Sequence, residues 1–191
     1  MGYQGIIRPF GTKEACPYIA ALRHHHPLVH LLTNHVVMNF TANLILAAGA
    51  SPAMVIAPEE VEHFAAVADA LLINVGTVTQ ESSRAMLLAV QSANRAERPW
   101  VLDPVAVGPI LSYRSDLVAT LLKESPAVIR GNPSEIRYLA GEESAALGPD
   151  SLESSDRALD SALRLANKYQ TIVAVTGEKD YITDGESIYQ I

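Results

Sequence analysis

Residues 31–54 read LLTNHVVMNFTANLILAAGASPAM, and this stretch has the pattern of a strand, a helix and a second strand. Its two ends are apolar, and between them an asparagine-rich segment leads into a run of small and apolar residues. Gly49 is suited to end that helix, because glycine accepts the left-handed conformation that helix C-termini often use. A strand, helix and strand in succession are typical of a parallel α/β sheet.

The polar side chains at the start of this helix have two explanations. In the first, Thr33, Asn34 and Asn39 cap the helix by accepting hydrogen bonds from its free N–H groups. In the second, they line a pocket, because small ligands are bound by mostly apolar surfaces with a few placed polar groups. Both explanations stay open for Asn34, and capping suits Asn39 better.

The rest of the chain repeats this alternation. Strands are predicted at residues 28–32, 53–57, 71–75, 100–102, 127–129 and 171–175. Helices are predicted at residues 13–23, 59–70, 81–95, 115–123, 133–140 and 156–169, and a terminal hairpin at 181–191 turns at Asp184-Gly185. The fold class is therefore α/β, a mostly parallel central sheet with helices on both faces in three layers.

Composition excludes several classes of function. The chain has 191 residues and a formal net charge of -7, so we expect one domain, residues 1–191, that binds neither nucleic acid nor an anionic membrane. Its single cysteine, Cys16, excludes an internal disulfide framework and fits the cytoplasm. We find neither a secretory signal nor the run of about 20 apolar residues that a membrane span needs.

Chemistry-bearing residues follow the predicted strands, where parallel sheets bind their ligands. These strand ends are Thr33-Asn34, Gly76-Thr77, Asp103-Pro104, Arg130-Gly131-Asn132 and Thr176-Gly177-Glu178. Carboxylate, guanidinium, hydroxyl and glycine at one edge of a sheet would suit phosphate and a divalent metal.

Each of these residues also has a purely structural explanation. Asp103 is either an oxygen ligand for Mg²⁺ or a turn-forming residue before proline. Arg130 either braces a nucleotide phosphate or pairs with a surface acid. Asn132 and Glu135 have the spacing of a capping box, which would also bring Glu135 close to a metal and its waters. Thr176 either lines a nucleotide site or simply ends a strand.

Two common nucleotide-binding motifs are absent from the sequence. It contains neither GxxxxGK[ST] nor GxGxxG, so neither a P-loop nucleotidase nor a standard dinucleotide-binding dehydrogenase is supported. If the chemistry is phosphoryl transfer, another arrangement must hold the triphosphate.

Five segments, in order, closely resemble those of hydroxyethylthiazole kinases, thiamine-salvage enzymes of the ribokinase-like superfamily. They read LTNHVVMNFTANLILAAGASPAM, INVGT, LDPVAVG, IRGNPSEI and VTGEKDYITDG. The resemblance covers most of the chain from about Pro27 onward. It implies a ribokinase-like fold and a cytoplasmic, ATP- and Mg²⁺-dependent kinase acting on the hydroxyl of 4-methyl-5-(2-hydroxyethyl)thiazole, with active sites at the interfaces of a homotrimer.

The resemblance also implies roles for individual residues. Met54, Asn34 and Val36 would contact the thiazole. Arg130 and Thr176 would contact ATP. Asp103 and Glu135 would organise Mg²⁺ and its waters.

The chain departs from the family pattern in one place. The family carries a later G-T-G-C segment that forms the anion hole and holds the cysteine at the position of the catalytic base, whereas this chain stops at Ile191. Cys16 does not match that motif, so the catalytic residue stays unknown and we expect an incomplete chain lacking its C-terminal elements. Two alternatives remain: another ribokinase-like small-alcohol kinase, acting on a sugar, nucleoside or pyrimidine, and a catalytically silent thiazole-binding module.

Overall fold

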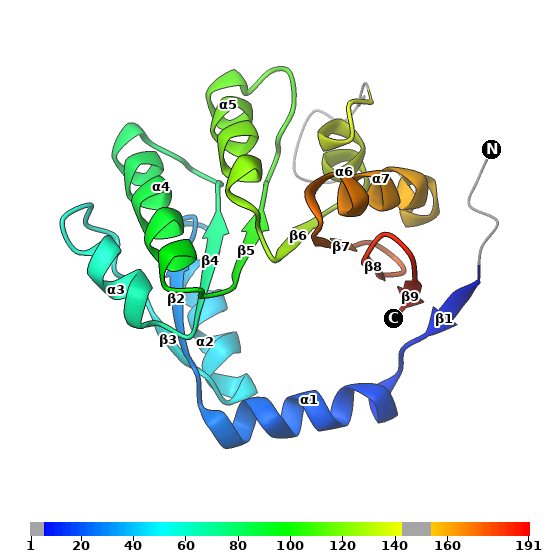
Figure 1. Ribbon diagram of the computed structural model, residues 1–191, viewed down its shortest axis with the longest axis horizontal. Helices are drawn as coiled ribbons and strands as arrows, with labels where there is room; N and C mark the ends of the chain where they lie inside the picture. Colours follow the sequence, from blue (N-terminus) through cyan, green and yellow to red (C-terminus); the bar gives the residue numbers. More distant parts are fainter. Residues whose placement is uncertain (1–5, 143–153) are drawn as a thin grey trace. The chain divides into compact units, whose positions relative to one another are not determined.

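The computed structural model describes residues 6–142 and 154–191 (Figure 1). The chain forms two compact units, one of Thr12–Leu102 and one of Met1–Gly11 with Asp103–Ile191. We call them the first and second units and describe each by itself. That the whole chain behaves as one domain stays a prediction.

In the first unit, three strands pair in parallel. The strand β2 (Leu28–Leu32) pairs with β3 (Ser51–Ala53) on one side and with β4 (Ala70–Asn74) on the other. In this register, His30 lies opposite Ala53 and Leu71. The predicted parallel arrangement is therefore confirmed in this unit.

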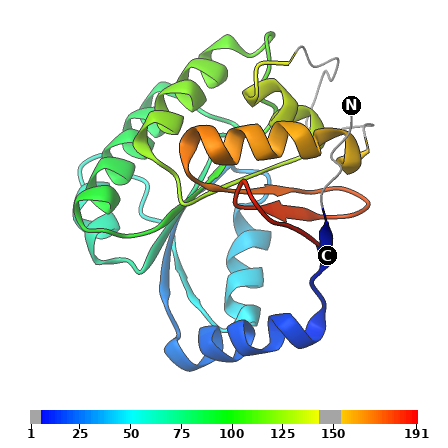
Figure 2. The ribbon, with the colours of Figure 1, turned by 45° about the vertical axis from the view of Figure 1, so that its right-hand side comes forward.

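Helices lie on both sides of these strands. The helices α3 (Val61–Val67) and α4 (Gln80–Arg95) lie on one side, and α2 (Met38–Ala48) lies on the other (Figure 2). The long α1 (Thr12–His25) precedes β2, and the consecutive histidines at its end, His24 to His26, are exposed. Among the buried core side chains are Leu31, Ile73, Met86 and Val90. This unit has the layered arrangement predicted for the fold.

The second unit begins where β5 (Trp100–Asp103) ends, and its sheet is mixed. The strand β6 (Val128–Gly131) runs parallel to β7 (Ile172–Val175). The predicted terminal hairpin, β8 (Tyr181–Thr183) and β9 (Ile188–Gln190), adds two antiparallel strands, and its turn contains Gly185 at φ 99°. A short strand that the sequence did not predict, β1 (Ile7–Pro9), pairs in parallel with β9.

In the part of the second unit that the structure describes, three helices and two short 3₁₀ segments accompany the strands. They are α5 (Ser112–Leu121), η1 (Leu122–Glu124), α6 (Pro133–Leu139), η2 (Ser155–Ala158) and α7 (Leu159–Tyr169). Both α6 and α7 lie on the same side of β7 and β8 (Figure 2). Buried apolar residues of α7, such as Leu165 and Ala166, are spaced to face the sheet.

Two local predictions were wrong. The second strand occupies Ser51–Ala53 rather than residues 53–57, because its pairing with β2 begins at Leu28 and Ser51. Asn39 does not cap α2, since it lies inside the helix and its side-chain oxygen accepts a hydrogen bond from Asn43. Gly49 ends α2 in the predicted left-handed conformation, at φ 109°. In the part of the chain that the structure describes, no helix is long and apolar enough to cross a membrane.

Candidate active site

In the second unit, predicted site residues lie at the carboxyl ends of strands. Asp103 ends β5, Arg130 and Gly131 end β6, and Thr176 directly follows β7. Gly131 lies opposite Val175 in the β6–β7 register, and the Thr176 N–H donates to the Gly131 carbonyl at 2.9 Å. The order of the strands therefore brings together residues that are far apart in the sequence.

Asp103 and Arg130 form an ion pair. Arg130 Nη1 donates to Asp103 Oδ2 at 3.2 Å. The Asp103 side chain is only 14% exposed, whereas that of Arg130 is 52% exposed. The pair joins a residue predicted to hold metal to a residue predicted to hold phosphate.

Glu135 is a buried carboxylate that holds two stretches of backbone. Its Oε1 accepts from the Ala106 N–H at 2.7 Å, and its Oε2 accepts from the Asn132 N–H at 2.8 Å. Asn132 Oδ1 in turn accepts from the Glu135 N–H at 3.0 Å, which confirms the predicted capping box of α6. A Cβ on Gly131 would lie 3.1 Å from Glu135 Oε2, so the close approach suits glycine.

The surroundings of Glu135 set its charge state. Burial raises the pKa of Glu135, and the nearby Asp103 charge raises it further. The Ala106 and Asn132 N–H groups and the Arg130 charge oppose this and lower the pKa. Two carboxylates thus lie near enough to repel each other, with one guanidinium beside them.

These residues fit a hydrated Mg²⁺ better than a fully coordinated metal. Among residues 6–142 and 154–191, no group of three or more histidine, cysteine, aspartate or glutamate side chains is arranged to hold a metal ion. Mg²⁺ commonly keeps several waters and uses one or two carboxylates together with substrate phosphates. Asp103 and Glu135 supply two carboxylates, and a cation would offset their repulsion.

The loop after Asp103 is held by residues that the sequence did not single out. Arg114 Nη1 donates to the Val105 carbonyl at 2.8 Å. Ser115 Oγ accepts from the Gly108 N–H at 3.1 Å and is 2.7 Å from the Gly108 carbonyl, to which it donates. Burial lowers the pKa of Arg114, and Glu135 opposes that shift. No motif marks Arg114 and Ser115, because their partners are backbone atoms of a preceding loop.

In the first unit, Asn34 is committed to hydrogen bonds within its own loop. It is 6% exposed, and its Nδ2 donates to Asn74 Oδ1 at 2.8 Å. Its Oδ1 accepts from the Val36 N–H at 2.9 Å and the Val37 N–H at 3.1 Å. A Cβ on Gly76 would lie 2.8 Å from the Asn34 side chain. Asn34 therefore shapes the turn before α2, and its contact with a substrate stays a prediction.

The other two predicted substrate contacts differ in exposure. Val36 is 83% exposed, and Met54 is half-buried directly after β3. Because β2 and β3 are parallel, the loops that follow them leave the same edge of the sheet. The Thr33 hydroxyl is buried there and has no hydrogen-bond partner in the described part of the chain, so Thr33 does not cap α2.

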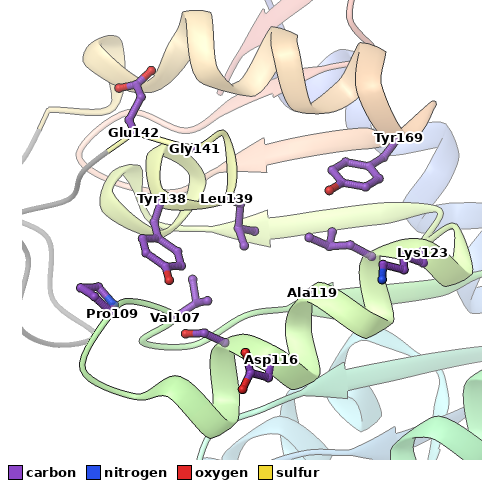
Figure 3. Close-up of a pocket in the computed structure, with 12 residues that line it drawn as sticks. Val107, Pro109, Asp116, Ala119, Lys123, Tyr138, Leu139, Gly141, Glu142 and Tyr169 are labelled. Carbon is purple, nitrogen blue, oxygen red and sulfur yellow. The ribbon is translucent and has the colours of Figure 1, made fainter.

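A pocket of about 800 Å³ lies in the second unit (Figure 3). Residues of α5 and α6, among them Asp116, Ala119, Tyr138 and Leu139, form its walls, and Tyr169 lies at one end. Asp103, Arg130, Glu135 and Thr176 are not among its lining residues. The strand-end cluster is thus separate from this pocket.

Alignments with related protein sequences cover almost all of the chain. Hydroxyethylthiazole kinases from Tolumonas auensis and Cronobacter sakazakii are 53% and 54% identical to it, each over 174 residues. These matches cover 91% of this chain and 65% of each relative, so the chain spans about two thirds of their length.

Solved structures share the fold. A hydroxyethylthiazole kinase from Pyrococcus horikoshii is 36% identical, with a TM-score of 0.83 over 94% of this chain and 67% of that one. A ribokinase-like superfamily protein from Enterococcus faecalis, 13% identical, has a TM-score of 0.61 over 100% of this chain and 72% of that one. These likenesses confirm the predicted ribokinase-like α/β fold. The model of the hydroxyethylthiazole kinase family matches residues 19–191, and the chain belongs to that family.

Proposed function

We propose that the full-length protein uses ATP to phosphorylate the hydroxyl of 4-methyl-5-(2-hydroxyethyl)thiazole, a step of thiamine salvage, in the cytoplasm. Family membership supports the reaction. The observation that carries the proposal for this chain is the cluster of Asp103, Arg130, Glu135 and Thr176 at the ends of β5, β6 and β7. Its carboxylates and guanidinium match the needs of a metal-bound triphosphate.

Within this proposal, the second unit binds the nucleotide. Arg130, more than half exposed, contacts the phosphates of ATP, and the Thr176 hydroxyl contacts the nucleotide beside it. Asp103 and Glu135 are the residues that would hold Mg²⁺. When bound, Mg²⁺ would neutralise the negative charge that develops on the phosphates.

The reaction is an in-line displacement. The thiazole hydroxyl oxygen forms a bond to the γ-phosphorus, the bond from that phosphorus to the β–γ bridging oxygen breaks, and the hydroxyl proton leaves to a base. The products are the thiazole phosphate ester and ADP. Because this reaction needs little covalent chemistry from the protein, positioning and charge neutralisation are the roles we assign to residues of this chain.

The acceptor binds in the first unit. Met54 and Val36 provide apolar contact to the thiazole ring. Asn34 holds the turn that contains Val36 through its bonds to the Val36 and Val37 N–H groups, and one of its two Nδ2 hydrogens is donated to Asn74.

The test measures ATP-dependent phosphate transfer by the full-length protein to the thiazole alcohol, to ribose, to a nucleoside and to a hydroxymethylpyrimidine. We expect kcat/KM for the thiazole alcohol to exceed the others by at least about 100-fold. A higher kcat/KM for another alcohol would assign a different kinase. Thiazole binding without any phosphate transfer would identify a silent binding module.

We further propose that the protein is a homotrimer. In α2 and the turn before it, Val36, Phe40 and Leu44 recur at a spacing of four residues and are 83%, 70% and 56% exposed. An apolar stripe of this kind on a helix supports burial against another protein surface. Light scattering after size-exclusion chromatography should give three times the monomer mass. Phe40→Asp should lower it, whereas the exposed Val67→Asp, on α3, should not.

A further inference from the structure

The first unit contains a buried histidine to which the proposed reaction gives no role. His30, in the middle of β2, is 0% exposed. One ring nitrogen, Nε2, lies 2.8 Å from the Val55 carbonyl oxygen. The other, Nδ1, is buried without a hydrogen-bond partner in the described part of the chain. A polar side chain in the core normally satisfies all of its polar atoms or serves a specific purpose.

The contacts of His30 define its protonation. A carbonyl oxygen can only accept, so Nε2 carries a hydrogen and donates it to Val55, and in the neutral ring Nδ1 then carries none. Burial lowers the pKa of His30, although the bond to Val55 opposes the shift. The ring of Phe64 meets the imidazole edge to face, with 4.9 Å between ring centroids. The imidazole is thus a neutral donor fixed in orientation.

His30 holds the chain on both sides of Met54. Its backbone lies opposite Ala53 in the β2–β3 register, directly before Met54. Its side chain bonds the carbonyl of Val55, directly after Met54. Since β3 ends at Ala53, this second bond anchors the backbone at the point where the strand pairing stops.

We infer that His30 is a positioning residue for the acceptor site, acting through the backbone of Met54. The inference rests on the proposed function, in which Met54 contacts the thiazole alcohol. A small displacement of a contact residue is costly because binding depends on preorganised geometry. Loss of the His30–Val55 bond should therefore weaken acceptor binding selectively.

The first experiment compares His30→Gln with His30→Asn in the full-length protein. A glutamine can place its amide nitrogen near the position of Nε2 and keep the bond, whereas an asparagine is too short to do so. We expect His30→Asn to raise KM for the thiazole alcohol about tenfold, with kcat and KM for ATP changed less than threefold. For His30→Gln, we expect the KM for the thiazole alcohol to stay close to the wild-type value.

The control is Val90→Ala, a truncation in the core of the same unit on α4. It should lower Tm without raising KM for the thiazole alcohol relative to KM for ATP. The inference is overturned if His30→Asn leaves the acceptor KM within twofold of wild type. It is equally overturned if both KM values of His30→Asn rise together, as a general loss of folded protein would produce.

A second readout does not require activity. It uses the ¹³C-methyl signals of the methionines, of which this 191-residue sequence contains four. His30→Asn should shift or broaden the Met54 methyl signal and leave that of Met86 on α4 unchanged. An unchanged Met54 signal would refute the positioning role. A perturbed signal in a protein that transfers no phosphate to the thiazole alcohol would instead keep the positioning role and reject the proposed function.

Discussion

Arg130 Nη1 lies 3.2 Å from Asp103 Oδ2, so the residue proposed for phosphate and a residue proposed for the metal form an ion pair. More than half of the Arg130 side chain is exposed, so a nucleotide phosphate could reach its guanidinium.

Asp103→Asn tests the metal side of the cluster. The substitution removes a charge but keeps the shape, so we expect kcat to fall about 100-fold or more while KM for the thiazole alcohol changes little. Steady-state kinetics over a range of Mg²⁺ concentrations provides the measurement. Wild-type kcat at saturating Mg²⁺ would remove Asp103 from the metal site.

Arg130→Ala tests the nucleotide side. We expect KM for ATP to rise about tenfold or more, because a charge-assisted bond to phosphate is lost. Arg130→Lys should recover only part of the effect, since lysine lacks the planar fork of arginine. Arg95→Ala, which breaks the exposed Arg95–Glu62 pair, is the matched control and should leave KM for ATP unchanged. An unchanged value for Arg130→Ala would remove this residue from the nucleotide site.

Gly185→Ala and Gly108→Ala form a pair that tests the terminal hairpin. Gly185 has φ 99°, and an added Cβ would lie 2.9 Å from the Asn167 side chain. Alanine there should lower the free energy of unfolding by about 1–2 kcal/mol. A Cβ on Gly108 would meet nothing within 4 Å, so Gly108→Ala should be neutral or slightly stabilising. Urea unfolding measures both, and equal effects would contradict the proposed strain.

Tyr181→Phe tests a pH-dependent contact in the second unit. The Tyr181 hydroxyl donates to Asp156, and burial together with this carboxylate raises the pKa of Tyr181 to about 12. The unfolded chain loses this proton near pH 10, so the stabilisation is complete below pH 10 and is lost as the pH rises through 12.

We expect Tyr181→Phe to lower the free energy of unfolding by roughly 1 kcal/mol at pH 8. The difference from wild type should shrink at pH 11, because phenylalanine does not titrate. Urea unfolding at the two pH values measures this. A difference that stays constant would show that the hydroxyl does not titrate differently in the folded and unfolded states.

Local patterns predicted most of the elements, and the errors have physical causes. Gly49, Gly185 and the Asn132–Glu135 capping box depend on neighbouring residues, and all three are confirmed. The strand β1 escaped prediction because it pairs with β9, which lies near the other end of the chain. Asn39 was misassigned as a cap because α2 already begins at Met38, directly after the turn that Asn34 holds, which places Asn39 inside the helix.

For the candidate site too, some features follow from the local sequence and others only from the tertiary structure. By itself, the sequence determined which residue types follow each strand, because strand ends and turns are set by short-range backbone preferences and by the order of apolar runs. Only the tertiary structure decided that Glu135 binds the Ala106 N–H, that Asn34 is tied to Asn74 and that His30 reaches Val55. These bonds join residues 25 to 40 positions apart, and the pairing of parallel strands, not local propensity, brings such residues together.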